Sequence, residues 1–227
     1  CSLGERDVCR DGNTRKYVRP IKIKRHREQT QKFPLFIFRF ATIQHSLKVF
    51  LITPMTQYIA DTEHYSEVIS RIPKVKRLLW IATADLKDLY VKKSEKNVVP
   101  LLQILNDLVK KGVEVRLIHA KEPGQAFRED FDKYSALWSK MERRLCPRVH
   151  MKIVVMDSEL VYIGSAILHE AGMGMKSAAN RNFEAGILTD EPGFIDAAMS
   201  HFDSIWEGTH CKQCGRKDFC LDRIKEK

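Results

Sequence analysis

The sequence has no hydrophobic run long enough to cross a membrane, no internal repeat and no low-complexity linker. Its most apolar stretch, residues 33–54, contains Arg39 and Lys48, so it falls short of the roughly 18 uncharged residues that a transmembrane helix requires. We therefore expect a soluble protein of the cytoplasm, with a membrane-associated or exported form as the alternative. With 44% hydrophobic and 9% aromatic residues the chain can still build a core, which excludes a disordered tail, a collagen and a small disulfide-rich scaffold.

Acidic residues are also scarce, since 29 Asp and Glu face 39 Lys and Arg and the formal net charge is +10. The basic excess lies at the N-terminus: residues 1–50 hold 12 basic and 4 acidic residues, whereas residues 51–227 hold 27 and 25. A basic segment of this kind attracts nucleic-acid phosphates or an anionic membrane surface. A solvated tail without a partner is the alternative interpretation.

Strands and helices alternate along the rest of the chain. Apolar periodicity and turn residues predict helices at 58–72, 97–112, 125–140 and 192–206, and strands at 75–83, 113–119, 144–146, 149–157, 160–165 and 183–188. This alternation is typical of an α/β fold, and the closely spaced strands between 144 and 166 indicate a hairpin, so we expect a mixed β-sheet flanked by helices. We divide the chain into a basic arm with an apolar segment (1–52), a core domain (53–208) and a Cys-rich tail (209–227).

One stretch of the core domain carries a spaced set of reactive residues. It reads His150-x-Lys152-x4-Asp157-x6-Gly164-Ser165, and Asn182-x-Glu184 follows downstream. The pattern resembles the His-x-Lys-x4-Asp-x6-Gly-Ser signature (HKD motif) of the phospholipase D superfamily, and the resemblance covers residues 53–208. It implies a phospholipase D-like fold, with one half-site per chain, and a phosphodiesterase activity.

The residue types suit that chemistry on their own terms. In a strand, residues two apart share a face, so His150 and Lys152 are expected to project together as a nucleophile beside a cation. Asp157 is at an odd offset and is expected to lie on the other face or at the strand end, where it holds the hairpin. Gly164 lets a phosphate approach the backbone, and the Ser165 hydroxyl can donate to it.

The resemblance implies a role for each residue. His150 attacks phosphorus to form a phosphohistidine, Lys152 and Ser165 stabilise the phosphate oxygens, and Glu184 accepts a hydrogen bond from the other ring nitrogen of His150. The candidate catalytic set is thus His150, Lys152, Asp157, Ser165 and Glu184, with Lys152, Gly164, Ser165 and Asn182 binding substrate. No cofactor is implied for catalysis. One position departs from the family: Ile167 stands where members commonly carry Asn.

The family's mechanism uses two such histidines, yet the signature occurs once in 227 residues. We therefore expect a homodimer with the site on its twofold axis; a monomer using His119 or His169 as the acid is the alternative. The basic arm favours a nuclease-like phosphodiesterase that acts on nucleic acid. The alternatives are a phospholipase D-type hydrolase acting on phospholipid or other phosphodiesters at a membrane surface, and a catalytically weakened nucleic-acid-binding module.

Three of the six cysteines crowd into the tail, as His210-Cys211-x2-Cys214-x5-Cys220. A Cys-x2-Cys turn presents two thiolates to one ion, and Cys220 with His210 or a more distant Cys completes a tetrahedral set. We expect a structural zinc at this cluster, with an iron–sulfur site as the lesser alternative. A disulfide or plain reduced thiols are the other interpretations.

Overall fold

The computed structural model describes residues 53–85, 89–94, 97–122, 124–168, 173, 175–222 and 224. The chain divides into two units, Cys1–Phe50 and Leu51–Lys227, and every described residue belongs to the second. The predicted basic arm, residues 1–52, lies outside the described residues. Within the described part of the chain, no helix has the length and apolar character needed to cross a bilayer.

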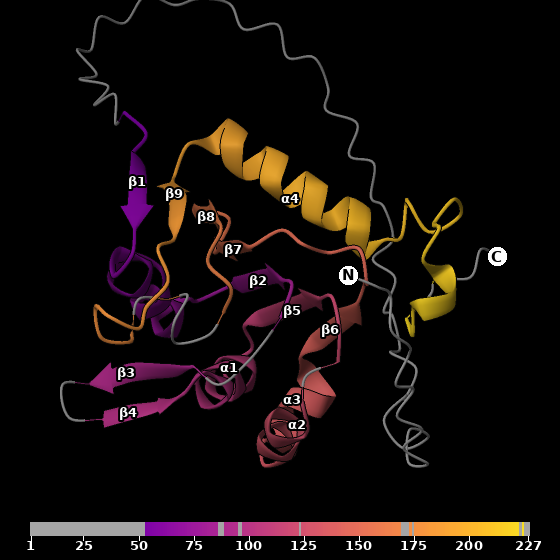
Figure 1. Ribbon diagram of the computed structural model, residues 1–227, viewed down its shortest axis with the longest axis horizontal. Coiled ribbons are helices and arrows are strands. Elements are labelled where there is room, and N and C mark those ends of the chain that lie inside the picture. Colours follow the sequence, from indigo (N-terminus) through magenta and orange to yellow (C-terminus); the bar gives the residue numbers. More distant parts are fainter. Residues whose placement is uncertain are drawn as a thin grey trace, which may run out of the picture. The chain divides into compact units, whose positions relative to one another are not determined.

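A seven-stranded mixed sheet forms the centre of the second unit (Figure 1). Its order is β1-β9-β8-β7-β2-β5-β6, in which β2, β5 and β6 run parallel and all other neighbours are antiparallel. The strands are β1 (Thr56–Ala60), β2 (Leu78–Thr83), β5 (Glu114–His119), β6 (Glu142–Leu145), β7 (Ile153–Met156), β8 (Leu160–Gly164) and β9 (Ala185–Thr189). A separate hairpin pairs β3 (Tyr90–Ser94) with β4 (Asn97–Pro100). The predicted mixed sheet is thus confirmed.

Helices cover both faces of this sheet (Figure 1). Helix α4 (Pro192–Trp206) lies on one face, where Phe202 stacks on Trp80 with ring centroids 5.0 Å apart. The other face packs on α1 (Leu101–Lys110), α2 (Gln125–Asp132), α3 (Ser135–Lys140), a π-helix (His64–Val68) and a 3-10 helix (Ile69–Lys74). Burial of apolar side chains on both faces holds the three layers together.

Helix α4 begins and ends as the sequence predicts. The Glu191 carboxylate caps its first turn by accepting hydrogen bonds from the backbone N–H groups of Gly193 and Phe194, at 3.0 and 2.6 Å. Pro192 occupies the first helical position, where its missing N–H costs nothing. Local signals therefore suffice to define this element.

Three predicted helices differ from the structure. The predicted helix 58–72 is wrong at its start, because Thr56–Ala60 is the edge strand β1, paired with β9 more than 120 residues later. The predicted helix 97–112 begins at Leu101, since Asn97–Pro100 is a strand of the β3–β4 hairpin. The predicted helix 125–140 is two short helices. Distant pairing overrides local periodicity in the first case.

The hairpin that carries the signature also differs from the prediction. Regular pairing in β7 covers only Ile153–Met156, so the predicted strand 149–157 is too long. Strand β6 is not part of the hairpin; it pairs in parallel with β5. The turn from β7 to β8 passes through Asp157 and Ser158, whose φ angles of 57° and 56° are those of the tight turn that matches strand twist.

Candidate functional site

Most of the predicted site residues lie at one edge of the sheet. Because β7 is antiparallel to β2 and β8, the start of β7 lies beside the ends of those two strands: Ile153 pairs with both Ala82 and Ile163. The backbone N–H of Gly164 donates to the carbonyl of Lys152 at 3.1 Å. Antiparallel pairing of β8 with β9 brings the start of β9 to the same edge. The two halves of the signature thereby meet, although they are distant in sequence.

His150 and Lys152 form a direct pair at this edge. The Lys152 side chain is only 9% exposed, and its ammonium donates to the backbone carbonyl of His150 at 2.8 Å. The same Nζ lies 3.3 Å from Nδ1 of the His150 ring. The contact does not arise from the shared face of a strand, as the sequence suggested. Both residues precede β7, and the Lys152 ammonium folds back onto the backbone of His150. The exposed ring accepts this contact at Nδ1 when its proton sits on Nε2.

Ser165 and Glu184 make the second pair, and Asn182 joins them. The Ser165 hydroxyl donates to one carboxylate oxygen of Glu184, and the Asn182 amide donates to the other at 3.1 Å. The backbone N–H of Ala185 donates to the Ser165 hydroxyl at 3.1 Å. In the contacts of the described residues, Glu184 is therefore bound to Ser165 and Asn182, and the implied bond to the His150 ring is not among them.

Asp61 holds the Glu184 segment in place, a role that sequence reasoning missed. Its N–H donates to the Glu184 carbonyl at 3.1 Å, and its carboxylate accepts from the Glu184 N–H at 3.3 Å. The φ of Asp61 is 45°, a left-handed conformation that Asp tolerates better than most residues. An Asp at the end of a strand is a usable signal, but only once β1 is recognised as a strand.

Gly164 has a packing role that the sequence did not reveal. A Cβ at this position would lie 2.1 Å from the Tyr162 hydroxyl, and one at Gly186 would lie 2.5 Å from the Tyr162 ring. The two glycines therefore make room for the buried Tyr162, whose ring meets His64 edge-on at 5.5 Å. Burial raises the pKa of the Tyr162 hydroxyl well above its usual range. The packing of Tyr162 therefore requires a glycine at position 164, independently of any phosphate that approaches the backbone there.

Asp157 lies at the opposite edge of the sheet, away from the other signature residues. Its carboxylate accepts hydrogen bonds from the backbone N–H groups of Lys76, Arg77 and Leu78, at 3.0, 2.6 and 3.1 Å. Burial alone would raise the pKa of Asp157, but these bonds outweigh it and hold the pKa below its usual value. The placement is that of a residue which holds the hairpin, and it takes Asp157 out of the set that can touch substrate.

Two other histidines, His119 and His169, are the candidates for the general acid in the monomer alternative. His119 is fully buried at the end of β5, and its Nδ1 lies 2.7 Å from the Lys121 carbonyl, so its ring cannot reach a substrate. His169 lies outside the described residues.

The position that departs from the family pattern, Ile167, is half-buried between the buried side chains of Ala166 and Leu168.

The edge strand β1 and its neighbour β9 expose apolar side chains near the site. Tyr58 on β1 is 68% exposed, and it pairs with the exposed Ile187 on β9. Phe183, between Asn182 and Glu184, is 92% exposed. Large apolar side chains gathered in this way are typical of interaction surfaces.

The tail brings together more cysteines than the three predicted ligands. Cys146, at the end of β6, lies within electrostatic range of Cys220: burial raises the pKa of the Cys220 thiol, and Cys146 and Cys211 add to that rise. As they stand, the predicted ligands do not converge, because no three His, Cys, Asp or Glu side chains among the described residues are placed to hold a metal ion. Cys146, Cys211, Cys214 and Cys220 are all free thiols.

A His–Lys pair and a Ser–Glu pair thus lie together at one end of the strands of a helix-covered mixed sheet. The family model described as cardiolipin synthase, PLD-like domain, matches residues 68–206. The chain therefore belongs to this family and to the phospholipase D superfamily of phosphodiesterases and transferases.

Solved structures share the fold. NucT from Helicobacter pylori is 15% identical with a TM-score of 0.52, over 68% of this chain and 97% of that one. Nuc from Salmonella typhimurium, a phospholipase D family member, is 18% identical with a TM-score of 0.50, over 68% of this chain and 95% of that one. No curated protein sequence matches the chain significantly.

Proposed function

We propose that this protein hydrolyses phosphodiester bonds in nucleic acid through a phosphohistidine formed on His150. The observation that carries the proposal is the meeting of the His150–Lys152 pair and the Ser165–Glu184 pair at one sheet edge. A buried ammonium and a hydroxyl beside an exposed imidazole are the groups that an anionic phosphate and a nucleophilic attack require.

Substrate binding prepares the nucleophile. The Lys152 ammonium now contacts Nδ1 of His150, and a phosphate oxygen, being anionic, competes for the same donor. Once Lys152 turns to the phosphate, the ring proton can occupy Nδ1 and leave the lone pair on Nε2 free to attack. Binding and activation are thereby coupled through one side chain.

The reaction then proceeds in two displacements. His150 nitrogen bonds to phosphorus while the bond from phosphorus to the leaving oxygen breaks, and a second histidine gives that oxygen a proton. Water next attacks phosphorus, the phosphorus–nitrogen bond breaks, and the second histidine takes the proton released by the water. Lys152 stabilises the charge on the non-bridging oxygens in both steps, and Ser165 joins it when its hydroxyl proton turns from Glu184 to the phosphate.

The second histidine is the partner subunit's His150 in a twofold dimer. The single copy of the signature in these 227 residues supports this assignment, and the burial of His119 argues against one acid of the monomer alternative. The exposed Tyr58, Phe183 and Ile187 beside the site supply an apolar surface for such an interface.

The net charge of +10, concentrated in residues 1–50, favours a polyanionic substrate over a small phosphodiester. A chromogenic diester, bis(p-nitrophenyl) phosphate, tests the chemistry, and plasmid DNA, RNA and phospholipid vesicles test the substrate class. We expect turnover of the diester and of nucleic acid by the full chain. Cleavage of vesicle lipid alone would replace nucleic acid by phospholipid, and nucleic-acid binding without turnover would leave a binding module.

Variants at the site test the mechanism. His150→Ala is expected to abolish turnover with little change in melting temperature, because its ring is exposed and packs no core. Lys152→Ala is expected to lower kcat by about 100-fold or more. His201→Ala, which removes an exposed histidine on α4, is the matched control and should keep full activity. Full activity in His150→Ala would overturn the mechanism.

The oligomeric state is tested by sedimentation and by mixing. We expect about twice the chain mass. Dimers that contain one wild-type and one His150→Ala chain should lose far more than half of the activity, since each reaction uses both histidines. A fully active monomer at high dilution would contradict the dimer.

A further inference from the structure

The tail after α4 is held to the core by very few inward-facing residues. No residue of 207–222 is buried, and regular structure there is limited to a 3-10 helix at Lys217–Phe219. Phe219 and Leu221, the large apolar residues of this segment, are exposed. The half-buried positions are Gly208, Cys211, Cys214, Cys220 and Asp222. Every cysteine of residues 207–222 is therefore half-buried while Phe219 and Leu221 are exposed; farther along, Ile224 is half-buried beside Gly208.

The first two of these cysteines lie on a tight turn. The N–H of Cys214 donates to the carbonyl of Cys211 at 3.2 Å, and the N–H of Cys211 donates to the carbonyl of Gly208 at 2.8 Å. A four-residue turn brings its end residues within about 7 Å, Cα to Cα. Two thiols on such a turn can bind the same metal centre.

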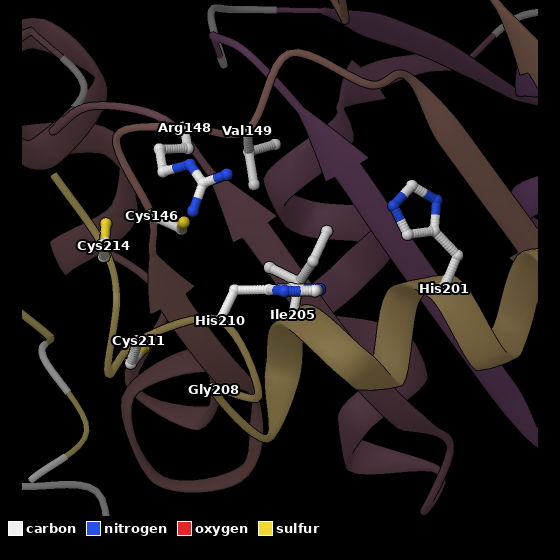
Figure 2. Close-up of a pocket in the computed structure, with 9 residues that line it drawn as sticks. All are labelled: Cys146, Arg148, Val149, His201, Ile205, Gly208, His210, Cys211 and Cys214. Atoms are coloured by element: carbon white, nitrogen blue, oxygen red, sulfur yellow. The ribbon is translucent and has the colours of Figure 1, made fainter. Parts of the chain in front are cut away.

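Cys220 returns the tail to the strand that carries Cys146. Its Sγ lies 3.8 Å from the carbonyl oxygen of Leu145, and the Asp222 carboxylate accepts a hydrogen bond from the Leu145 N–H at 2.7 Å. The residue that follows Leu145 is Cys146. Cys146, Cys211 and Cys214 line one cavity of about 240 Å³, with the tail on one side and the segment of Cys146 on another (Figure 2).

We propose that Cys146, Cys211, Cys214 and Cys220 together form a four-thiolate metal centre, of the kind that takes Zn²⁺ or an iron–sulfur cluster. Both occupants share this ligand chemistry. Among the described residues, no three of these side chains are yet placed around a common point. Closure requires rotation about χ1 of cysteines that are each only partly buried, and Cys146 starts from a position packed against the α4 side of the core.

The structure favours Cys146 over His210 as the fourth ligand. The His210 ring is turned toward Ile205, away from the thiols, and the His201 ring lies farther along α4 (Figure 2). Cys146 comes from the core domain, so a centre that includes it joins two segments that are otherwise linked by few contacts. A set of His210 with the three tail cysteines would cross-link the tail only to itself.

Charge around the cavity suits a thiolate centre. Arg148 lines this cavity with Cys146, Cys211 and Cys214, and it also lines the neighbouring cavity with His210 and Lys212. Four thiolates around Zn²⁺ carry two net negative charges, which nearby basic side chains offset. The surroundings are basic where the occupied centre is anionic.

The centre also fixes the segment that leads to His150. The N–H of Val149 donates to the Cys146 carbonyl at 2.9 Å, and Val149 is buried against the α4 side of the core. His150 follows directly. Metal binding at Cys146 therefore stabilises both the tail and the backbone from which His150 projects.

Metal analysis of the full chain, purified anaerobically without chelator, is the first test. We expect about one Zn²⁺ per chain, or about four Fe with acid-labile sulfide and absorbance near 400 nm for a cubane cluster. Either composition supports the centre and identifies its occupant. Absence of both metals, with Cys211, Cys214 or Cys220 found in disulfides, would overturn it.

Variants test the choice of ligands. Cys146→Ser is expected to weaken metal binding at least about tenfold and to lower the melting temperature, whereas His210→Ala should retain the metal, as should the control Cys9→Ser. Retention of metal by Cys146→Ser together with its loss in His210→Ala would overturn the assignment. If Cys146→Ser does not fold, thiol titration of native wild-type protein decides: four cysteines should react only after the metal is displaced, and immediate reaction of Cys146 would refute its role.

Discussion

His119 provides a pH-dependent contribution to stability that can be calculated from its surroundings. Its side chain is 0% exposed, and its ring donates from Nδ1 to the Lys121 carbonyl, 2.7 Å away. Nε2 has no hydrogen-bond partner among the described residues. Burial first, and then the positive charge of Arg143, lower the pKa of His119 from 6.5 to about 4, although Asp85 and the carbonyl contact oppose the shift.

The sign and size of the effect follow from these two pKa values. The unfolded chain takes up the proton near pH 6.5 and the folded chain only near pH 4, so acid favours unfolding. This contribution is complete above pH 6.5 and is lost as the pH falls toward 4. The loss between pH 7 and pH 5 amounts to about 2 kcal/mol, and it reaches about 3 kcal/mol below pH 4.

Denaturant unfolding at pH 7 and pH 5 measures this difference. His119→Asn keeps a donor near the Lys121 carbonyl and removes the titration, so its stability should fall by about 2 kcal/mol less than that of wild type between the two pH values. The variant's lower absolute stability does not affect this comparison. The exposed His201→Asn is the matched control and should follow wild type. An unchanged pH dependence in His119→Asn would refute the reasoning.

Three further changes test the structural assignments. Asp157→Ala should lower the free energy of unfolding by about 2 kcal/mol, because three backbone N–H groups lose their acceptor, while kcat in the diester assay stays within a few-fold; a large loss of kcat in a stable protein would return Asp157 to the chemistry. Gly186→Ala should destabilise by about 1–3 kcal/mol in thermal unfolding, since its Cβ meets the Tyr162 ring and the Ile163 carbonyl. Ile167→Asn should raise kcat if the missing amide is a handicap, and an unchanged or lower kcat would mean that the site is adapted to Ile167.

Much of the fold was predictable because its signals are local. Strand β8, the parallel strands β2 and β5 and the capped helix α4 each lie close to their predicted ranges. Strand β1 was not predictable in this way. Its residues, Thr56–Ala60, precede a helical segment, and they become a strand only because β9 offers an edge to pair with. No local pattern encodes a partner so far along the chain.

At the candidate site, the structure brings most of the residues in the sequence motif together, but through contacts that the sequence did not predict. The spacing of His150 and Lys152 suggested strand neighbours, yet their contact arises from an ammonium that folds back onto a carbonyl before β7 begins. Gly164 suggested access for a phosphate, and the structure adds the packing of Tyr162. Asp61 and Cys146 could not be predicted from local patterns, because only the tertiary fold brings Glu184 to Asp61 and the Cys220 segment to Leu145, the residue before Cys146.

The contacts at the candidate site hold Ser165 and Glu184 in place and leave the His150 ring free to move. Ser165 is fixed through its N–H to the Ala185 carbonyl at 2.9 Å, and Glu184 is fixed through both backbone bonds to Asp61. Tyr162 packs against Gly164 and Gly186, so the side of the candidate site that carries Ser165 and Glu184 is held in place by the fold itself. The His150 ring, by contrast, is exposed and contacts Lys152, the group that a phosphate would recruit. A preorganised anion site lowers the barrier only if the nucleophile and acid reach it in the correct order. In the proposed dimer, the phosphate that engages Lys152 frees one His150 to attack, and the partner subunit's His150 supplies the proton that the leaving oxygen takes up.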